Sequence, residues 1–435
     1  MAKRYNAVEA QIRAGSVAAT VAQETTAHDI GGSTSVISAT TEEIARNSYD
    51  QLWGDGDQDN YTHPSYRPKN RDLYLNRRIQ DAREGGTKRS KNPEHEFLGR
   101  VSLIMGIDEV LAKELFSARP YKAIRTNRFG YDPEITVHER ARLLIDELEK
   151  ANIEATELDW FAGSLLFKAS DMPLVSESDV VRSGRAFIQS PTSYMPVISL
   201  EVQEGDAVLD MCAAPGGKTA LIADRSETSV LVANELKPRR LERMRDVLGT
   251  LMIKGVRIVN HDAKHLGHHY GNDAFNRILA DVECSTEAGV NFESREPLKG
   301  WSRERVERSA RLQRQIIRVG YDLLKPGGTL VYSTCSLAPE ENEFVIDALL
   351  NARRDAIVQP IELTVEDRVR QIRKWGHKKI TSEASEGVLR IAPNQYLEPF
   401  TVIRIRKPTG EKELDSMMHH AVNLDELVTM RESLN

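Results

Sequence analysis

After Gly205, short apolar runs alternate with segments of helical periodicity. The runs read AVLDM, VLVANE, VRIVNHD, FNRILADV and GGTLVYSTCS, and the segments between them include TALIAD, KPRRLERMRDVLGTL and ERSARLQRQIIRVGYDLL. Buried strands that alternate with crossover helices predict an α/β fold with a parallel, doubly wound sheet. Such sheets bind ligands beyond the carboxyl ends of their strands, so we expect the functional residues directly after these runs.

Upstream of this region the pattern differs. Residues 1–95 are polar and rich in Thr, Ser, Asn and Gly, which predicts a partly disordered extension with a basic segment. Residues 96–185 predict a small α+β domain, in which GRVSLIMGIDEVLAKELFSA reads as a helix and 136–150 forms an amphipathic helix. We expect the α/β domain to span 186–408 and an acidic tail to occupy 409–435.

The composition excludes several classes of protein. The chain of 435 residues has no apolar run long enough to cross a membrane and no apolar stretch typical of a signal peptide at its start. Its three cysteines are too few for a disulfide framework and indicate a reducing compartment. We therefore expect a cytoplasmic protein that binds no membrane, and we expect a monomer.

The net charge of −6 hides a strong asymmetry along the chain. Two stretches, 67–91 and 295–318, are basic, whereas the segments 1–60 and 411–435 are acidic. Each basic stretch alone could be a solvated helix face. Basic stretches of this kind can also neutralise the phosphates of a nucleic acid.

The loop after the first run contains two adjacent glycines and leads into a predicted helix. Its residues are Cys212, Ala213, Ala214, Pro215, Gly216, Gly217 and Lys218. Glycine lets the backbone approach a ligand, and a helix N-terminus offers free N–H groups to an anion. The phosphate-binding pattern G-x-x-x-x-G-K-[ST] would require glycine at position 212. That residue is cysteine, which disfavours an ATPase.

Acidic residues end the next two runs. Glu235 closes the second run, where an acid of a doubly wound sheet typically accepts hydrogen bonds from ribose hydroxyls. Asp262 closes the third run, and there we expect it to contact an adenine amino group. Together with the glycine loop, these acids predict a ligand that carries an adenosyl group.

Cysteines follow the fourth and fifth runs. Cys284 comes shortly after Asp281, and Cys335 ends the run YSTC. A single such cysteine could fill the core, but two beside an adenosyl site indicate covalent catalysis. A thiolate that adds to C6 of cytosine converts C5 into an enamine-like carbon that accepts a methyl group. We expect Asp281 to stabilise charge near N3 of the base and a second group to assist product release.

These motifs resemble the Nol/Nop/Sun family of RNA 5-methylcytosine methyltransferases, of the RsmB/RsmF type. The motifs are DMCAAPGGKT, ANE, DVxCS and YSTCSLAPEENE, and the resemblance covers about residues 125–407. It implies a Rossmann-like catalytic domain behind a small RNA-recognition domain, matching 96–185. It also implies S-adenosylmethionine as the methyl donor and RNA as the substrate, and we favour ribosomal over transfer RNA.

The resemblance implies a role for each motif residue. Cys335 would be the nucleophile, Cys284 would promote product release, and Asp281 would contact the cytosine, with Lys218 near the base. The implied cofactor-binding residues are Cys212, Ala213, Ala214, Pro215, Gly216, Gly217, Lys218, Glu235, Arg240, Asp262 and Asp281. We expect no metal. The acids of PEENE suit the N-terminus of the helix that they begin, so we interpret them as structural.

One loop departs from the family pattern. Glu283 stands where the family usually has proline, and a carboxylate beside the Cys284 thiol should raise the pKa of that thiol. This feature alone favours the alternative hypothesis, a non-catalytic RNA-binding ribosome-assembly factor on the same fold. The basic stretch 295–318 follows the loop, and we expect its arginines to bind RNA phosphates.

Overall fold

The computed structural model describes residues 92–117, 119–363, 365 and 367–410. All of these residues fall in one of the two contact units of the chain, Lys69–Asn435. The expected extension 1–95, apart from its last four residues, and the acidic tail from 411 onwards lie outside the described residues, as does the basic segment 67–91.

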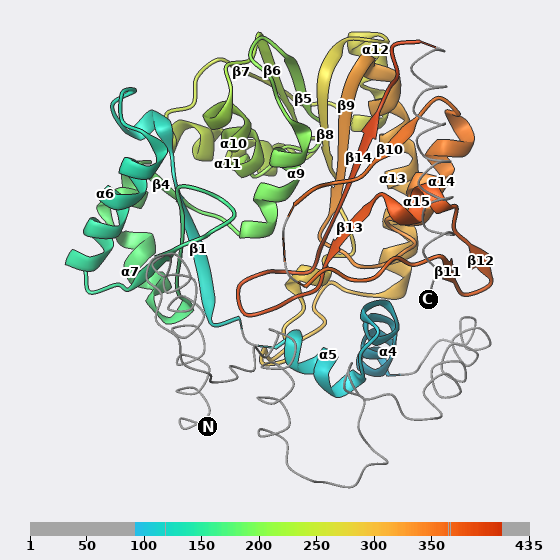
Figure 1. Ribbon diagram of the computed structural model, residues 1–435, viewed down its shortest axis with the longest axis horizontal. Coiled ribbons are helices and arrows are strands. Elements are labelled where there is room, and N and C mark those ends of the chain that lie inside the picture. Colours follow the sequence, from blue (N-terminus) through green and yellow to red (C-terminus); the bar gives the residue numbers. More distant parts are fainter. Residues whose placement is uncertain (1–91, 118, 364, 366, 411–435) are drawn as a thin grey trace, which may run out of the picture. The chain divides into compact units, whose positions relative to one another are not determined.

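The larger sheet has the strand order β10-β14-β9-β8-β5-β6-β7, with β13 paired to β14 (Figure 1). Its strands are β5 (Ala207–Asp210), β6 (Val230–Asn234), β7 (Val256–Val259), β8 (Phe275–Asp281), β9 (Leu324–Thr334), β10 (Ile357–Gln359), β13 (Val388–Ile391) and β14 (Phe400–Arg406). The five strands from β5 to β9 pair in parallel. This result confirms the predicted doubly wound sheet, whereas β14 inserts antiparallel between β9 and β10.

Helices cover both faces of this sheet, because successive side chains of a buried strand point to opposite sides. Val208 joins the core with α9 (Tyr194–Leu200), α10 (Gly217–Arg225) and α11 (Pro238–Thr250). The next residue, Leu209, joins the opposite core. That core includes residues of α13 (Arg303–Leu323), α14 (Glu343–Ala352) and α15 (Ser382–Glu386), and α12 (Gly267–Tyr270) packs against α13.

Helix α13 illustrates how the sequence builds these layers. Ser302 caps its first turn, and its side chain accepts a hydrogen bond from the backbone N–H of Arg305. Val306, Ala310 and Ile317 recur at the spacing of one helix face and are buried. Among the described residues, every helix is too short or too polar to cross a membrane.

A separate four-stranded antiparallel sheet precedes the larger one, in the order β2-β3-β1-β4. Its strands are β1 (Tyr121–Thr126), β2 (Ala155–Glu157), β3 (Ser164–Lys168) and β4 (Ala186–Ile188), and it packs with α6 (Val137–Lys150), α7 (Met172–Glu177) and α8 (Asp179–Arg182). The amphipathic helix predicted over 136–150 is confirmed, with Thr136 and Glu139 forming a reciprocal capping box.

The segment GRVSLIMGIDEVLAKELFSA forms two helices rather than one. They are α4 (Pro93–Met105) and α5 (Glu109–Leu115), and Gly106 separates them in the left-handed conformation, at φ +71°. The ring of Phe97 packs edge-on against Phe116 and Trp301. These helices therefore bury their apolar side against loops of the larger domain, and the small sheet itself spans 121–188. This arrangement differs from the expected boundaries at 96 and 186.

Candidate active site

The glycine loop lies where the strand order diverges, since β5 pairs with β6 on one side and β8 on the other. Gly216 has φ +104°, a conformation that favours glycine, and a Cβ there would lie 3.0 Å from the side chain of Met244. A Cβ on Gly217 would lie 3.0 Å from Phe187. Gly216 therefore suits the left-handed turn, and both glycines leave room for the loop to lie close to its neighbours.

Glu235 lies at the end of β6 and is 3% exposed. One carboxylate oxygen accepts a hydrogen bond from the backbone N–H of Lys237 at 2.8 Å. The other lies 3.5 Å from Nη1 of Arg240, whose Nη2 donates to the carbonyl of Ala214 at 2.6 Å. Arg240 therefore ties the glycine loop to the acid predicted to bind ribose.

Asp262 follows β7 and caps the short helix η4 (Ala263–His265). Its carboxylate accepts from the backbone N–H of Lys264 at 3.1 Å and lies 3.2 Å from the ammonium of that residue. Asn234, which sequence reasoning missed, donates from Nδ2 to the carbonyls of Met211 and His261 at 2.9 and 3.0 Å. It holds the ends of β5, β6 and β7 together, and only its position beside Glu235 could have signalled this role.

The donor set around this loop fits S-adenosylmethionine. The N-terminus of α10 suits a carboxylate, and the remaining lone pairs of Glu235 suit ribose hydroxyls. Asp210 has a buried Oδ1 with no hydrogen-bond partner among the described residues, and such an oxygen suits an ammonium group. Within the same ranges, no group of three or more His, Cys, Asp or Glu side chains is arranged to hold a metal ion.

Asp210 is a second residue that sequence reasoning missed. It is 1% exposed at the end of β5, and its Oδ2 accepts a hydrogen bond from Oγ1 of Thr219 at 2.7 Å. Burial raises the pKa of this carboxyl group from 3.8 to about 7, and the hydrogen bond from Thr219 only partly opposes that rise. Its protonation therefore changes across the neutral range.

This shift predicts how stability depends on pH. Because the folded-state pKa of Asp210 exceeds the unfolded value, its contribution to stability is fully present below about pH 4 and is lost as pH rises towards 7. Asp210→Asn should therefore gain roughly 1–3 kcal/mol in unfolding free energy relative to wild type between pH 5 and pH 8, at about 1.4 kcal/mol per unit. Urea denaturation at both pH values measures the difference. The exposed-site control Asp146→Asn should show no such change, and an equal effect of Asp210→Asn at both pH values would contradict the prediction.

Cys284 and Cys335 lie together beyond β8 and β9. The structure brings their sulfur atoms into contact, with Cα atoms 6.5 Å apart. The thiolate is the nucleophilic form of either cysteine. The third cysteine, Cys212, is free, and burial raises the pKa of its thiol, which makes it a poor nucleophile.

Asp281 lies at the end of β8 and contacts two neighbouring elements. Its Oδ2 is 2.8 Å from Nζ of Lys218, and its Oδ1 accepts from Oγ of Ser333 at 2.7 Å. The side chains of Lys218 and Asp281 are 15% and 25% exposed, so both retain access to solvent. Asp281 therefore connects the glycine loop, through Lys218, to the end of β9, through Ser333.

The acids of the PEENE segment, residues 339–343, form hydrogen bonds that stabilise the loops around the two cysteines. Glu341, fully buried, accepts from the backbone N–H of Ser285 at 2.9 Å and from Nε2 of Gln313 at 3.0 Å. Glu343 is fully buried, and both of its carboxylate oxygens accept from Nη2 of the buried Arg390, at 2.7 and 2.6 Å. Of these, only Glu343 lies in the first turn of α14. Their role is structural, as expected, but it rests on contacts with specific loops rather than on the helix dipole.

The carboxylate of Glu283 forms an ion pair with Nζ of Lys237 at 2.7 Å. Burial opposes the ionisation of Glu283, but the hydrogen bond and charge of Lys237 outweigh it and hold the pKa of Glu283 below its ordinary value. Its negative charge is therefore balanced, which weakens the expected effect on Cys284. Arg305, in the basic stretch, donates from Nε to the carbonyl of Cys284 at 3.2 Å, so this arginine fixes the loop.

Comparison with known proteins finds relatives that are named as RNA methyltransferases. The model of the 16S rRNA methyltransferase RsmB/F family matches residues 197–400. The chain is 34% identical over 224 residues to the tRNA (cytosine(49)-C(5))-methyltransferase of Pyrococcus abyssi, an alignment that covers 51% of this chain and 70% of that protein. It is 36% identical over 175 residues to the ribosomal RNA small subunit methyltransferase B of Vibrio cholerae.

The extent of these alignments is uneven. The match to the Vibrio protein covers 40% of this chain and 39% of that protein, so the chain spans less than half of its length. A solved methyltransferase homologue from Pyrococcus horikoshii has the same fold, with a TM-score of 0.59 at 24% identity, covering 77% of this chain and 99% of that one. The chain therefore belongs to the RsmB/F family of methyltransferases, which take their methyl group from S-adenosylmethionine.

Proposed function

We propose that this protein methylates C5 of a cytosine in RNA, with Cys335 as the nucleophile. The observation that carries the proposal is the convergence of two cysteines, Asp281 and Lys218 beside a loop that fits S-adenosylmethionine. The Pyrococcus and Vibrio relatives are named for tRNA and ribosomal RNA respectively. We favour ribosomal RNA as the substrate of this chain, and we propose that it acts as a monomer.

S-adenosylmethionine, when bound, supplies a methyl group on a positively charged sulfur. The residues of the chain prepare the acceptor. The reduced thiolate of Cys335 adds to C6 of the cytosine, which forms a C–S bond and moves electron density to C5. C5 then takes the methyl group. A nearby base accepts the C5 proton, the electron pair of the C5–H bond re-forms the C5=C6 double bond, and the C6–S bond breaks to return Cys335 to the thiolate.

Asp281 positions the cytosine during this sequence. Negative charge that develops at N3 and the exocyclic amine requires a proton donor or a hydrogen-bond partner, and a carboxyl group at the end of β8 can provide one. Lys218, 2.8 Å from Asp281, orients that group and places a positive charge beside the ring. We assign product release to Cys284, because its sulfur lies against that of Cys335.

The target base must be unpaired or turned out of its helix to expose C6, at a cost of a few kcal/mol. We propose that the small α+β unit contributes to RNA binding. Arg125 of β1 connects it to the site, since its Nε donates to Oε1 of Gln189 at 2.9 Å and its guanidinium lies 5.6 Å from the ring of Phe187. Both neighbours lie against Gly217 of the glycine loop.

The direct test is methyl transfer from labelled S-adenosylmethionine to total RNA by the reduced wild-type protein. We expect label in RNA, with 5-methylcytosine as the product after digestion to nucleosides. RNA binding without methyl transfer, at saturating cofactor, would instead favour the assembly-factor alternative.

A further inference from the structure

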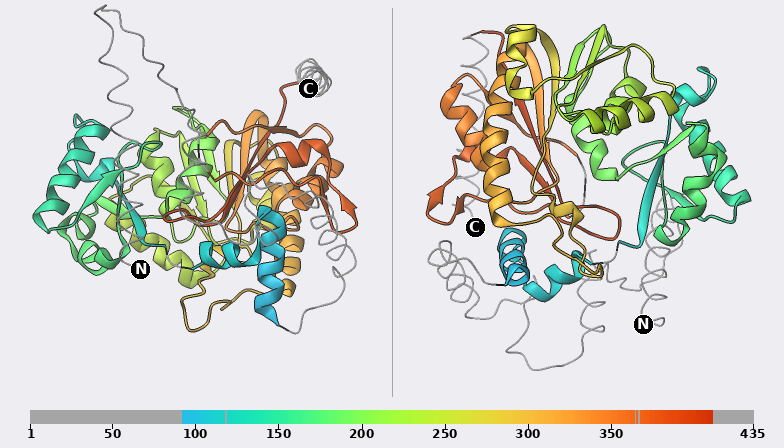
Figure 2. Two further views of the ribbon diagram at one scale, coloured as in Figure 1. Left: turned by 60° about the horizontal axis from the view of Figure 1, so that its bottom comes forward. Right: turned by 180° about the vertical axis from the view of Figure 1, so that it is seen from behind.

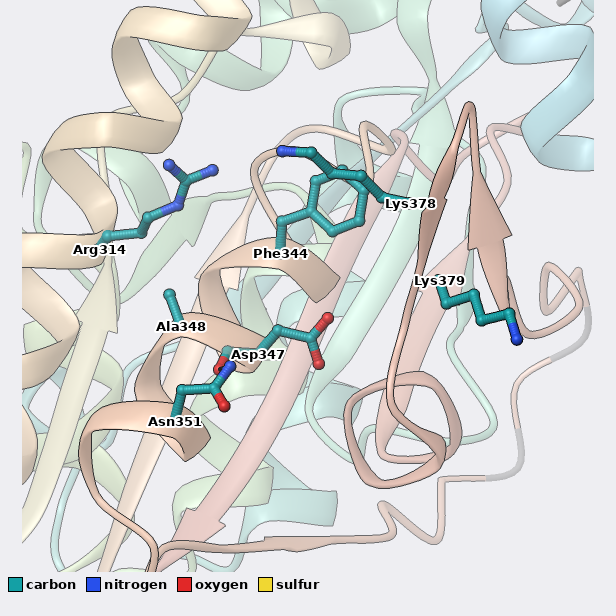
Figure 3. Close-up of a pocket in the computed structure, with 7 residues that line it drawn as sticks. All are labelled: Arg314, Phe344, Asp347, Ala348, Asn351, Lys378 and Lys379. Carbon is teal, nitrogen blue, oxygen red and sulfur yellow. Dashed lines mark hydrogen bonds between the residues drawn. The ribbon is translucent and has the colours of Figure 1, made fainter. Parts of the chain in front are cut away.

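A groove outside the site described above lies between α13, α14 and a β-hairpin. The hairpin consists of β11 (Lys374–Trp375) and β12 (Lys378–Lys379), joined by a two-residue turn in which Gly376 has φ +57°. The groove has a volume of about 470 Å³. Its lining residues are Arg314, Phe344, Asp347, Ala348, Asn351, Lys378 and Lys379 (Figure 3).

We propose that this groove binds the backbone of an RNA strand that flanks the target cytosine. The inference rests on the proposed function and adds to it a second contact surface on the catalytic domain. In the view of Figure 3, the guanidinium of Arg314 and the ammonium of Lys378 face one another across the opening above Phe344. Among the described residues, neither cation has an ion-pair partner. Like charges that converge in this way favour an anion between them.

The segment that contains the hairpin is basic, although Arg373 within it pairs with Glu386 at 3.3 Å. Residues 368–381 contain no acid and hold Arg368, Arg370, Arg373, Lys374, Lys378 and Lys379. Lys374 and Lys379 are directly opposite each other in the hairpin, an arrangement that destabilises a strand pair. A bound polyanion would relieve this repulsion.

A linear array of charge, rather than one isolated cation, points to a polymer. Arg311, Arg314 and Arg318 recur at three- and four-residue spacing along one side of α13, which places successive Cβ atoms about 5–6 Å apart. Nη2 of Arg318 donates to the carbonyl of Ala348 at 3.4 Å, so this row lies along α14. The backbone of a nucleic acid presents a regular row of negatively charged phosphates, which such a row of arginines could contact.

The groove also offers an aromatic surface and little opposing charge. Nζ of Lys378 lies 5.2 Å from the ring centroid of Phe344, a half-buried residue on which an unpaired base could stack once the lysine engages a phosphate. The one acid of the lining, Asp347, accepts hydrogen bonds from the backbone N–H and Oγ1 of Thr381 at 3.3 and 2.6 Å. These bonds hold the carboxylate at the N-terminus of α15, which Thr381 caps.

Short connections tie the groove to the cysteine loops. Trp375 of the hairpin donates from Nε1 to Glu340 at 2.9 Å, and Arg100 of α4 donates to the same carboxylate at 2.8 Å. On α13, Arg314 follows Gln313, which donates to the carbonyl of Glu283 at 3.0 Å. RNA held here would be attached to the same elements that position Cys284.

The test compares Arg314→Gln/Lys378→Gln with a charge-matched control, Lys254→Gln/Arg257→Gln, whose residues are exposed at the β7 edge of the sheet. Binding of a mixed-sequence single-stranded RNA oligonucleotide is measured over a series of salt concentrations. We expect the groove variant to bind roughly tenfold more weakly at low salt. Its slope of log affinity against log salt should fall by about 1.4, at about 0.7 per phosphate contact. The control should match wild type.

Each outcome decides between the two claims. If wild type binds the RNA and the groove variant binds with the same affinity and slope, the inference is wrong and the proposed function is unaffected. If wild type binds no RNA at any salt concentration, both fail. Photo-crosslinking of 4-thiouridine RNA gives a second readout, with crosslinked peptides expected from the hairpin or from the first turns of α14, and crosslinks confined to other elements would contradict the proposal. Unchanged cofactor affinity in both variants confirms that they are folded.

Discussion

Replacing Cys335 with alanine is expected to abolish methyl transfer to RNA while leaving cofactor binding intact. The substitution removes the atom that would add to C6, and without that addition C5 remains too electron-poor to accept a methyl group. We expect the rate to fall by more than about a thousandfold, a loss typical of an enzyme deprived of its nucleophile.

The cofactor affinity of Cys335→Ala is the control for this prediction. Calorimetric titration with S-adenosylmethionine should give the wild-type affinity. The residues that we expect to bind this cofactor lie in the glycine loop and at Glu235, whereas Cys335 follows β9. Loss of both activity and cofactor binding would indicate a damaged fold, and Cys335→Ser would then replace it as the test. Full methyl transfer by either variant would overturn the assignment.

Replacing Cys284 with alanine should have a different effect, namely accumulation of a covalent protein–RNA adduct. The sulfur of Cys284 lies against that of Cys335, where it can assist proton loss from C5 and the breaking of the C6–S bond. Without it, addition of Cys335 and methyl transfer continue but release slows. Denaturing gel electrophoresis after incubation with RNA and cofactor measures the adduct.

The prediction for Cys284 depends on its neighbour Glu283, which stands where the family usually has proline. Because Lys237 pairs with Glu283, the carboxylate has a partner other than Cys284, and the loop is fixed further by Arg305 and Gln313. We therefore expect Cys284 to retain its role in release despite the missing proline. Absence of any adduct in Cys284→Ala, with turnover at the wild-type rate, would show that another group releases the product.

The local pattern was sufficient for much of the fold. Alternating apolar runs predicted β5 to β9, and the helical spacing of apolar residues over 136–150 predicted α6, because each of these patterns is contained within a short stretch of sequence. The pairing of β14 between β9 and β10 was beyond reach, since its partners are about seventy and forty residues away in sequence and no local period encodes such a register.

In the site, too, features that depend on local sequence could be predicted, and contacts between distant residues could not. Its loop residues could be predicted because ligands of a doubly wound sheet bind after the strands. The contact between Lys237 and Glu283, and the buried acids that brace the cysteine loops, depend on side chains that approach only in the folded chain. The shifted pKa of Asp210 likewise follows from burial, which the residue type alone does not reveal.

The central claim is that Cys335 forms the covalent bond to the base. Its most direct test is RNA in which cytosine carries fluorine at C5, because the adduct then lacks a proton to lose and cannot be resolved. After incubation with cofactor and protease digestion, mass spectrometry identifies the modified peptide. We predict the nucleotide on Cys335 in wild type and in Cys284→Ala, and no adduct in Cys335→Ala. An adduct on Cys284, or one that forms normally without Cys335, would contradict it.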